Sequence, residues 1–223
     1  MTIGVLEVER RGDGVVVATL NRPDKRNALN AELRQALIDT LWGLAADDDV
    51  KAVVLCGSGG TFCAGFDLDE LMAADDRAEV FAHATAYHHA VYTFGKPLVA
   101  AIEGAAVAGG MDLALMCDLR VAACDARFGQ PQVKMGVPAA FDLIKTVVSE
   151  PIARDLCLTG RIIEAAEALG IGLIGHSVEP GSALDAAVLL AAEIAGIRGA
   201  IAMKQAFVSA QPVLFAFEQA EDG

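Results

Sequence analysis

Two glycine-rich segments constrain the fold of this chain more than any other feature of its sequence. One runs from Gly59 to Asp67 and the other from Glu103 to Asp118. Each follows a short apolar run and precedes a helical pattern, as expected for a strand that ends in a turn and opens a helix. Such turns leave backbone N–H groups unpaired at a helix N-terminus, where the helix dipole favours negative charge. Two such turns facing one another could bind a single developing oxyanion, and oxyanion stabilisation often contributes most to the catalysis of acyl chemistry.

Short apolar runs and helical patterns alternate along the first part of the chain. Leucines recur at helical spacing after Asn30, which can cap that helix, and Trp42 on the same helix is predicted to pack in the core or at a helix interface. A further helical region is expected over 68–89, with a break near Asp75 and Asp76. Strands are expected at 15–20, 52–56, 98–102 and 119–123. This alternation predicts an α/β fold with largely parallel strands.

The character of the sequence changes after Pro138, where helix-like stretches follow one another between glycines. They are expected at 153–158, 164–169, 183–195 and 201–208. Without a low-complexity linker or an internal repeat, residues 1–223 are predicted to form a single domain. It would have a core over 1–140 and a helical C-terminal portion over 141–223, and the acidic residues 218–223 would be a frayed tail.

The bulk composition narrows the class of protein. The chain has 223 residues, 54% of them hydrophobic, which is enough for one sizeable core. Its formal net charge of −13 makes a nucleic acid or an anionic membrane surface an unfavourable partner. No secretory signal precedes the first strand, and the five cysteines lack the spacing of a zinc site. We therefore expect a soluble cytoplasmic protein with reduced thiols and no bound metal.

Four segments together resemble the enoyl-CoA hydratase/isomerase (crotonase) superfamily, and they cover nearly the whole chain from about Val15 to Ala206. They are Asn21-Arg22-Pro23 through Asn30, Phe62-Cys63-Ala64-Gly65-Phe66-Asp67-Leu68, Lys96-Pro97 through Arg120, and Leu158-Thr159-Gly160-Arg161 through Gly172. The resemblance implies a crotonase-like α/β spiral of ββα units with a helical C-terminal region, assembled as a homotrimer or a hexamer. It also implies that the ligand is an acyl-CoA thioester, which is a substrate rather than a resident cofactor.

The resemblance assigns roles to particular backbone groups. The N–H groups of Phe66 and Gly109 match the family's oxyanion hole and would donate to the thioester carbonyl. The glycines of these turns could instead serve the fold alone, since conformational freedom is the first use of glycine. The positions expected to contact the coenzyme A part of the substrate are Ala28, Ala64, Asp67 and Leu68, with Arg26 as the phosphate partner.

The family's two catalytic glutamates correspond here to Asp112 and Gln132. A carboxyl group can transfer a proton and an amide cannot, so hydration by two acids is in doubt. In one interpretation Asp112 is a lone acid/base and Gln132 orients water or substrate. An aspartate at the Asp112 position resembles the dienoyl-CoA isomerase branch, although that branch has a glutamate at the Gln132 position. In another, Asp112 and Asp142 serve an unfamiliar acyl-CoA. In a third, Asp112 is a buried carboxylate paired with a cation for structural reasons.

Three more positions are candidates for the acyl pocket. His88 lies in the helical region that lines this pocket in the family, while Phe141 and Asp142 replace part of the family's glycine-rich turn. Phe141 could equally be a core residue, and packing or solvated histidines are more common than ligating ones. Family members commonly continue with a further helical segment beyond the position of Gly223, so the C-terminal portion is expected to be shortened.

The function expected from these residues is that of an enoyl-CoA hydratase (a lyase) or isomerase in fatty acid metabolism. It would stabilise a thioester enolate with the N–H groups of Phe66 and Gly109 and transfer protons through Asp112. The alternative of a different class is a non-catalytic acyl-CoA carrier or sensor, which Gln132 favours and Asp112 disfavours. A degenerate structural subunit without a working coenzyme A pocket is the remaining alternative.

Overall fold

The computed structural model describes residues 4–73 and 77–214. Its strands are β1 (Leu6–Arg10), β2 (Val15–Leu20), β3 (Ala52–Gly57), β4 (Leu98–Ile102), β5 (Ala105–Val107), β6 (Leu119–Ala123), β7 (Arg127–Gly129), β8 (Ile162–Glu164) and β9 (His176–Val178). Its α-helices are α1 (Ala31–Ala46), α2 (Leu68–Ala73), α3 (Arg77–Tyr92), α4 (Gly109–Met116), α5 (Phe141–Ile144), α6 (Glu150–Thr159), α7 (Ala165–Gly170), α8 (Ala183–Ala195) and α9 (Ala200–Ala210), with 3-10 turns η1 (Pro23–Lys25) and η2 (Pro131–Met135).

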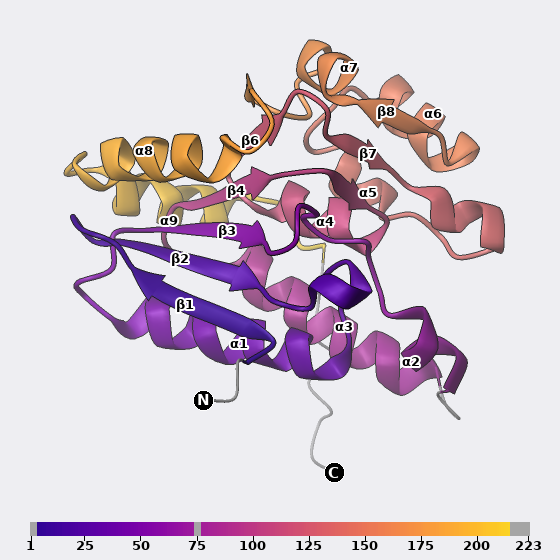
Figure 1. Cartoon of the computed structure of the whole chain (residues 1–223), viewed down its shortest axis with the longest axis horizontal. Helices are drawn as coiled ribbons and strands as arrows, with labels where there is room; N and C mark the ends of the chain where they lie inside the picture. The colour runs from indigo at the N-terminus through magenta and orange to yellow at the C-terminus, as the bar shows by residue number, and fades with distance from the viewer. Residues whose placement is uncertain (1–3, 74–76, 215–223) are drawn as a thin grey trace.

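The strands form two sheets. The larger sheet has the order β1-β2-β3-β4-β6-β9, and all of its neighbours are parallel except the antiparallel pair β1–β2. The smaller sheet has the order β5-β7-β8. The chain thus leaves the larger sheet after β4, adds β5 to the smaller one, and returns through α4 to β6 (Figure 1). These crossings bring both glycine-rich segments to the junction between the two sheets.

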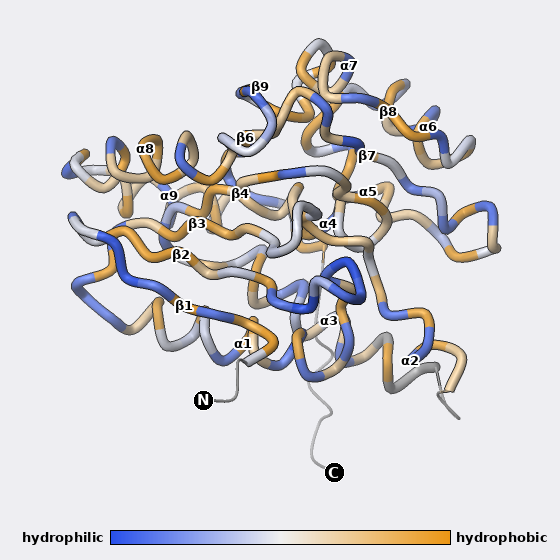
Figure 2. Tube along the Cα trace, in the orientation of Figure 1, coloured by the Kyte–Doolittle hydropathy of each residue, from blue (hydrophilic) through white to orange (hydrophobic). Residues whose placement is uncertain are grey.

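The central strands are buried on both faces, which explains their continuous apolar character. Alternate residues of a strand point to opposite faces, and Val16 and Ala18 of β2 join the cluster packed against α1 while Val15 and Val17 join the cluster packed against α8. Figure 1 accordingly shows α1 and α3 on one side of the sheet and α8 on the other. In Figure 2 hydrophobic colours follow β2 and β3, whereas hydrophilic segments gather at the edge strand β1.

Helix α1 confirms most of what its sequence predicts. The Asn30 side chain accepts a hydrogen bond from the backbone N–H of Leu33 at 3.0 Å, and the leucine stripe is buried. The expected burial of Trp42 is wrong, because 66% of this side chain is exposed. It follows Leu41 on the turn and therefore lies beside the apolar stripe rather than within it.

The long elements agree with the sequence better than the short ones. The strands at 98–102 and 119–123 and the helix at 183–195 have the expected bounds. No sequence pattern indicates β5, β7, β8 or β9, because their three residues each are too few for a periodic pattern. The break expected near Asp75 and Asp76 and the tail at 218–223 lie outside the described residues, and the single domain with a division at residue 140 stays a prediction.

Among the described helices, none is by itself long and apolar enough to cross a membrane. The pair α8 and α9 reaches the required length and composition together, with a bend of 99° between the two helices.

Candidate active site

The two glycine-rich turns are in direct contact. Gly65 has a φ of +99°, and a Cβ atom at this position would lie 2.9 Å from Cβ of Ala108 and 3.1 Å from the backbone nitrogen of Gly109. A Cβ on Gly109 would in turn lie 3.0 Å from ring carbons of Phe66. Real Cβ contacts are rarely this short. The glycines therefore permit a close approach of two backbone segments, in addition to serving as turn residues.

Backbone hydrogen bonds hold this approach in place. The N–H of Cys63 donates to the carbonyl of Ala105 at 3.0 Å, and the N–H of Leu29 donates to the carbonyl of Gly65 at 2.8 Å. The N–H of Ala108 donates to the carbonyl of Gly129 in β7 at 2.8 Å, which fixes a non-glycine residue at a φ of +51°. Strained backbone of this kind persists where its surroundings impose it, and such positions cluster at functional sites.

The N–H groups of Phe66 and Gly109 remain available at the junction of the two turns. Within the described residues neither N–H donates to a backbone acceptor, and both residues line the same cavity. Gly109 is the first residue of α4, whose dipole favours negative charge at that end. The pair of donors expected from the sequence is thus assembled around one hollow.

The cavity has a volume of about 470 Å³ and is mostly apolar. Its wall comes from the two turns, from α2 and α3, from η2 and from the loop that precedes α5. The residues that line it are Ala64, Phe66, Leu68, Leu71, Ala84, Thr85, His88, Ala108, Gly109, Asp112, Pro131, Gln132, Met135, Val137, Pro138, Ala139 and Ala140. A few polar groups in an otherwise apolar hollow are typical of a small-molecule site.

Asp112 lies in the first turn of α4 and is only 6% exposed. Its Oδ1 accepts a hydrogen bond of 2.8 Å from the side-chain amide of Gln130, and no cation pairs with it among the described residues. Burial raises the pKa of this carboxyl from 3.8 to about 7, against the opposing effect of the Gln130 hydrogen bond. A carboxyl group at a cavity wall whose pKa is near neutral pH is suited to proton transfer. The interpretation of Asp112 as a carboxylate paired with a cation does not agree with its described surroundings.

Gln132 faces the cavity beside Asp112, and Gln130 connects the two side chains. The Gln132 Nε2 donates to the Gln130 Oε1, and both glutamines are buried. The Gln132 Oε1 is buried without a hydrogen-bond partner among the described residues. The sequence alone assigns no role to Gln130, because nothing in its neighbourhood shows that β7 brings it next to α4.

His88 lines the cavity from α3, and an aromatic cluster surrounds it. Its ring lies 4.3 Å from the Tyr87 ring and 6.1 Å from the Phe66 ring, measured between centroids. Burial, together with the charge of Arg34, lowers the pKa of His88 to about 4, so the imidazole is neutral near pH 7. A neutral imidazole suits packing or hydrogen bonding to an acyl chain better than the binding of an anion.

Arg34 is a buried residue that the sequence does not single out. Its guanidinium lies 5.5 Å from the centroid of the Phe66 ring and forms an ion pair of 2.7 Å with Glu70 of α2. It also donates to the carbonyl of Leu29 at 2.8 Å. Arg34 therefore connects α1 with α2 and with the first glycine turn, where it contacts the Phe66 ring.

A smaller hollow of about 210 Å³ shares Ala64, Phe66 and Leu68 with the cavity and opens beside Arg26 and Ala28. Asp67 also lines it and forms an ion pair of 2.8 Å with Arg22. Burial opposes ionisation of Asp67, but the hydrogen bond and charge of Arg22 outweigh it and lower the pKa. Arg22 donates to the Ala28 carbonyl as well, so it connects the entry segment to the first glycine turn. Arg26 is exposed at this mouth, where a phosphate could reach it.

Phe141 and Asp142 lie away from the cavity. Asp142 is exposed and forms an ion pair of 2.5 Å with Lys145, while the Phe141 ring lies 5.3 Å from Lys145 Nζ and 5.7 Å from the Arg154 guanidinium. Ala139 and Ala140 form the corresponding part of the wall instead. The structure thus brings Asp112 together with Gln132 and His88 but not with Asp142.

Within residues 4–73 and 77–214, no group of three His, Cys, Asp or Glu side chains could hold a metal ion. The five cysteines are unpaired thiols, three of them buried.

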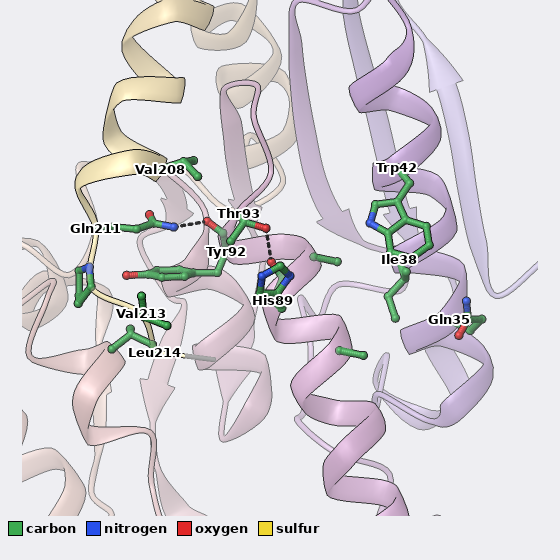
Figure 3. A pocket seen from close by; sticks show the side chains of 13 residues that line it. Gln35, Ile38, Trp42, His89, Tyr92, Thr93, Val208, Gln211, Val213 and Leu214 are labelled. Atoms are coloured by element: carbon green, nitrogen blue, oxygen red, sulfur yellow. Dashed lines mark hydrogen bonds between the residues drawn. The ribbon is translucent and has the colours of Figure 1, made fainter. Parts of the chain in front are cut away.

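A second and larger cavity, of about 650 Å³, lies between α1, α3 and residues 208–214 (Figure 3). The side chains of Trp42 and Ile38 approach it from α1, and Val213 and Leu214 approach it from the opposite side. Within its lining, the Gln211 side chain donates a hydrogen bond to the Tyr92 carbonyl at 2.9 Å. No residue lines both this cavity and the cavity that contains Asp112.

The solved structures similar to this one have the crotonase fold. An enoyl-CoA hydratase from Mycobacterium smegmatis superposes with a TM-score of 0.86 at 35% identity, over 92% of this chain and 82% of that one. The sequence model of the enoyl-CoA hydratase/isomerase family matches residues 10–219 of this chain. The chain belongs to the enoyl-CoA hydratase/isomerase family.

Two curated relatives give the same assignment. A Thermus thermophilus protein described as an enoyl-CoA hydratase is 45% identical over 81% of this chain and 74% of its own length. The enoyl-CoA hydratase EchA19 of Mycobacterium tuberculosis is 39% identical over 82% of this chain and 72% of its own length. The resemblance inferred from four sequence segments is therefore confirmed, as is the α/β fold class.

Proposed function

We propose that this protein binds an acyl-CoA thioester and catalyses a reaction of the enoyl-CoA hydratase or isomerase type. The observation that carries the proposal is the position of Asp112, buried at the wall of the cavity that Phe66 and Gly109 also line. The thioester carbonyl would accept from the two backbone N–H groups while negative charge develops on its oxygen as an enolate. Asp112 would take a proton from the substrate or from water and return it to carbon.

The smaller hollow supplies a path for the coenzyme A part of the substrate. It adjoins the cavity at Ala64, Phe66 and Leu68, which line both hollows, and Arg26 is exposed at its mouth. The acyl chain would occupy the apolar space between α3 and η2, beside the neutral His88. We further propose that the protein acts in the cytoplasm and assembles as a homotrimer or a hexamer, as the resemblance to the family implies.

The amide at Gln132 bears on whether this site hydrates an enoyl-CoA or catalyses another reaction of an acyl-CoA. An amide cannot transfer a proton, so Asp112 would act alone and Gln132 would orient water or the acyl chain. The same observation favours the second candidate function, a carrier or sensor that binds acyl-CoA without converting it. The two candidates share the binding site and differ only in turnover.

The test combines binding and turnover on the purified protein. Calorimetry with short and long enoyl-CoA thioesters measures binding, and loss of the conjugated enoyl absorbance measures hydration. We expect binding together with slow turnover, and a gain in hydration in Gln132→Glu, which restores a second carboxyl group. Binding without turnover of any thioester would favour a carrier or a substrate outside the enoyl series, and the absence of binding would refute both candidates.

A further inference from the structure

The hydrogen bonds that join Gln132, Gln130 and Asp112 have a direction. The amide of Gln132 donates to the carbonyl oxygen of Gln130, and the amide of Gln130 donates to the carboxylate of Asp112. A side-chain amide has its acceptor on one side and its donors on the other, so the orientation of one amide fixes that of the next. An ionised carboxylate only accepts, which requires the direction seen here.

The free end of this series lies at the wall of the cavity. Gln132 lines the cavity, and its Oε1 is buried there without a hydrogen-bond partner among the described residues, whereas Gln130 is fully buried behind it and takes no part in the lining. A buried acceptor without a donor is unfavourable, and a ligand that supplies a donor relieves it. The orientation of Gln132 therefore affects which ligands the cavity accepts.

We propose that Gln130 and Gln132 form an amide relay, through which the protonation state of Asp112 determines whether Gln132 offers the cavity an acceptor or a donor. With Asp112 ionised, Gln132 presents its carbonyl oxygen and selects acyl groups that carry a hydroxyl. With Asp112 protonated, the carboxyl group donates to Gln130, both amides turn over, and Gln132 presents its N–H to ligands that only accept. Gln130 is then a positioning residue. The inference rests on the proposed binding of acyl-CoA.

The ionisable groups near Asp112 whose pKa is shifted are moved away from neutral pH. Burial raises the pKa of Cys63 to about 12 and raises that of Tyr87, on the side of the first glycine turn and α3. The pKa of His88, also on α3, falls to about 4, and that of Cys157 on α6 is raised by burial. The charged groups of α5 and its end, Asp142 and Lys145, are paired with each other at the surface. Strand β5 carries no titratable side chain.

The test uses two matched ligands that cannot react, because their α-carbon bears no hydrogen. Hydroxypivaloyl-CoA offers a hydroxyl donor, and its methyl ether, methoxypivaloyl-CoA, offers only an acceptor. We expect the affinity ratio of hydroxyl over ether to rise about threefold to tenfold between about pH 5.5 and pH 8.5, the effect of one neutral hydrogen bond. Calorimetry on the full chain measures the ratio, and steric differences between the ligands cancel in its pH dependence.

The decisive variant is Gln130→Met, which interrupts the relay, removes the Gln130 hydrogen bond to Asp112, and alters no residue that lines the cavity. Both ligands should still bind, and the affinity ratio should lose its pH dependence, as it should in Gln132→Met. A ratio that still changes with pH in Gln130→Met would show that Asp112 acts on the ligand directly, and a constant ratio in the unaltered protein would also refute the relay. Failure of both ligands to bind the unaltered protein would refute the proposed function instead, and the relay with it.

A spectroscopic measurement keeps the test independent of the stability of the variant. In the unaltered protein, the side-chain amide resonances of Gln132 should shift with pH at the midpoint at which the Asp112 carboxyl titrates. Resonances that stay constant through this titration would exclude the relay.

Discussion

The cavity between α1 and α3 and the cavity at the glycine turns differ more in the groups that line them than in their volumes. The cavity at α1 and α3 is the larger, at about 650 Å³ against about 470 Å³, and it contains the exposed Trp42. The cavity at the glycine turns contains a buried carboxyl group with a raised pKa, a buried amide oxygen without a partner among the described residues, and two available backbone donors. Only the second arrangement is unfavourable for a folded protein without a ligand.

This difference shows how a site can be recognised in a structure without a ligand. An apolar hollow can arise wherever helices pack imperfectly, and it costs little beyond lost contacts. Burying Asp112 away from a cation, by contrast, opposes its ionisation and destabilises the fold near neutral pH. A protein retains such a loss of stability where its reaction requires the buried carboxyl group. The cavity at the glycine turns is therefore the candidate active site. Four experiments test this assignment.

The largest effect is expected from Asp112→Asn. The amide keeps the shape and the hydrogen bonding of the side chain but cannot exchange a proton, so turnover of an enoyl-CoA thioester should fall by about 10²–10⁴-fold. Binding of the thioester should change little. Trp42→Ala in the larger cavity is the matched control and should leave turnover unchanged. Equal turnover in Asp112→Asn and the unaltered protein would end the assignment of Asp112.

The next effect concerns the contact between the two glycine turns. In Gly65→Ala, the new Cβ would collide with Ala108 and the Gly109 nitrogen. This should displace the N–H groups proposed as oxyanion donors and lower turnover by about 10²–10³-fold. Gly60→Ala is the control, because Gly60 also has a positive φ, of +73°, but no atom within 4 Å of the new Cβ. If both variants lose turnover equally, backbone strain rather than the contact is responsible.

The pH dependence of stability gives a smaller and independent effect. The pKa of Asp112 rises from 3.8 to about 7 on folding, so its neutral form stabilises the fold at low pH, and this contribution is lost as pH rises through about 7. At about 1.4 kcal/mol per pKa unit, Asp112→Asn should gain up to about 4 kcal/mol over the unaltered protein between about pH 4 and pH 8. Urea unfolding at several pH values measures this difference. A difference that does not depend on pH would mean that Asp112 is not poised by burial.

The smallest effect is expected at the mouth of the smaller hollow. Arg26 is exposed, so its contact with a phosphate of coenzyme A is screened by solvent and salt. Arg26→Ala should weaken binding of acyl-CoA by about twofold to tenfold, and the loss should shrink at high salt. Arg198→Ala removes an exposed cation far from the site and is the control. An unchanged affinity in Arg26→Ala would remove Arg26 from the site.

Local sequence patterns are enough to predict several elements of this fold. The leucine stripe of α1 and its Asn30 cap are written in neighbouring residues, as are the apolar strands β2, β3, β4 and β6. The two glycine-rich turns and Asp112 were also identified from the sequence, because glycine turns and carboxyl groups carry a recognisable chemical signal. The burial expected for Trp42 was wrong, since a position beside an apolar stripe does not settle which side a large side chain takes.

The surroundings of these residues depend on the packing of the folded chain. Gln130 reaches Asp112 because the end of β7 bonds to the residue before α4, and Arg34 of α1 lies 5.5 Å from the Phe66 ring of the first turn. In the same way, Asp142 faces Lys145 and the solvent, and Ala139 and Ala140 face the cavity in its place. The pKa of a buried carboxyl and the direction of an amide depend on such contacts between segments distant in sequence. These contacts form only when the chain folds, so a local sequence pattern cannot predict them.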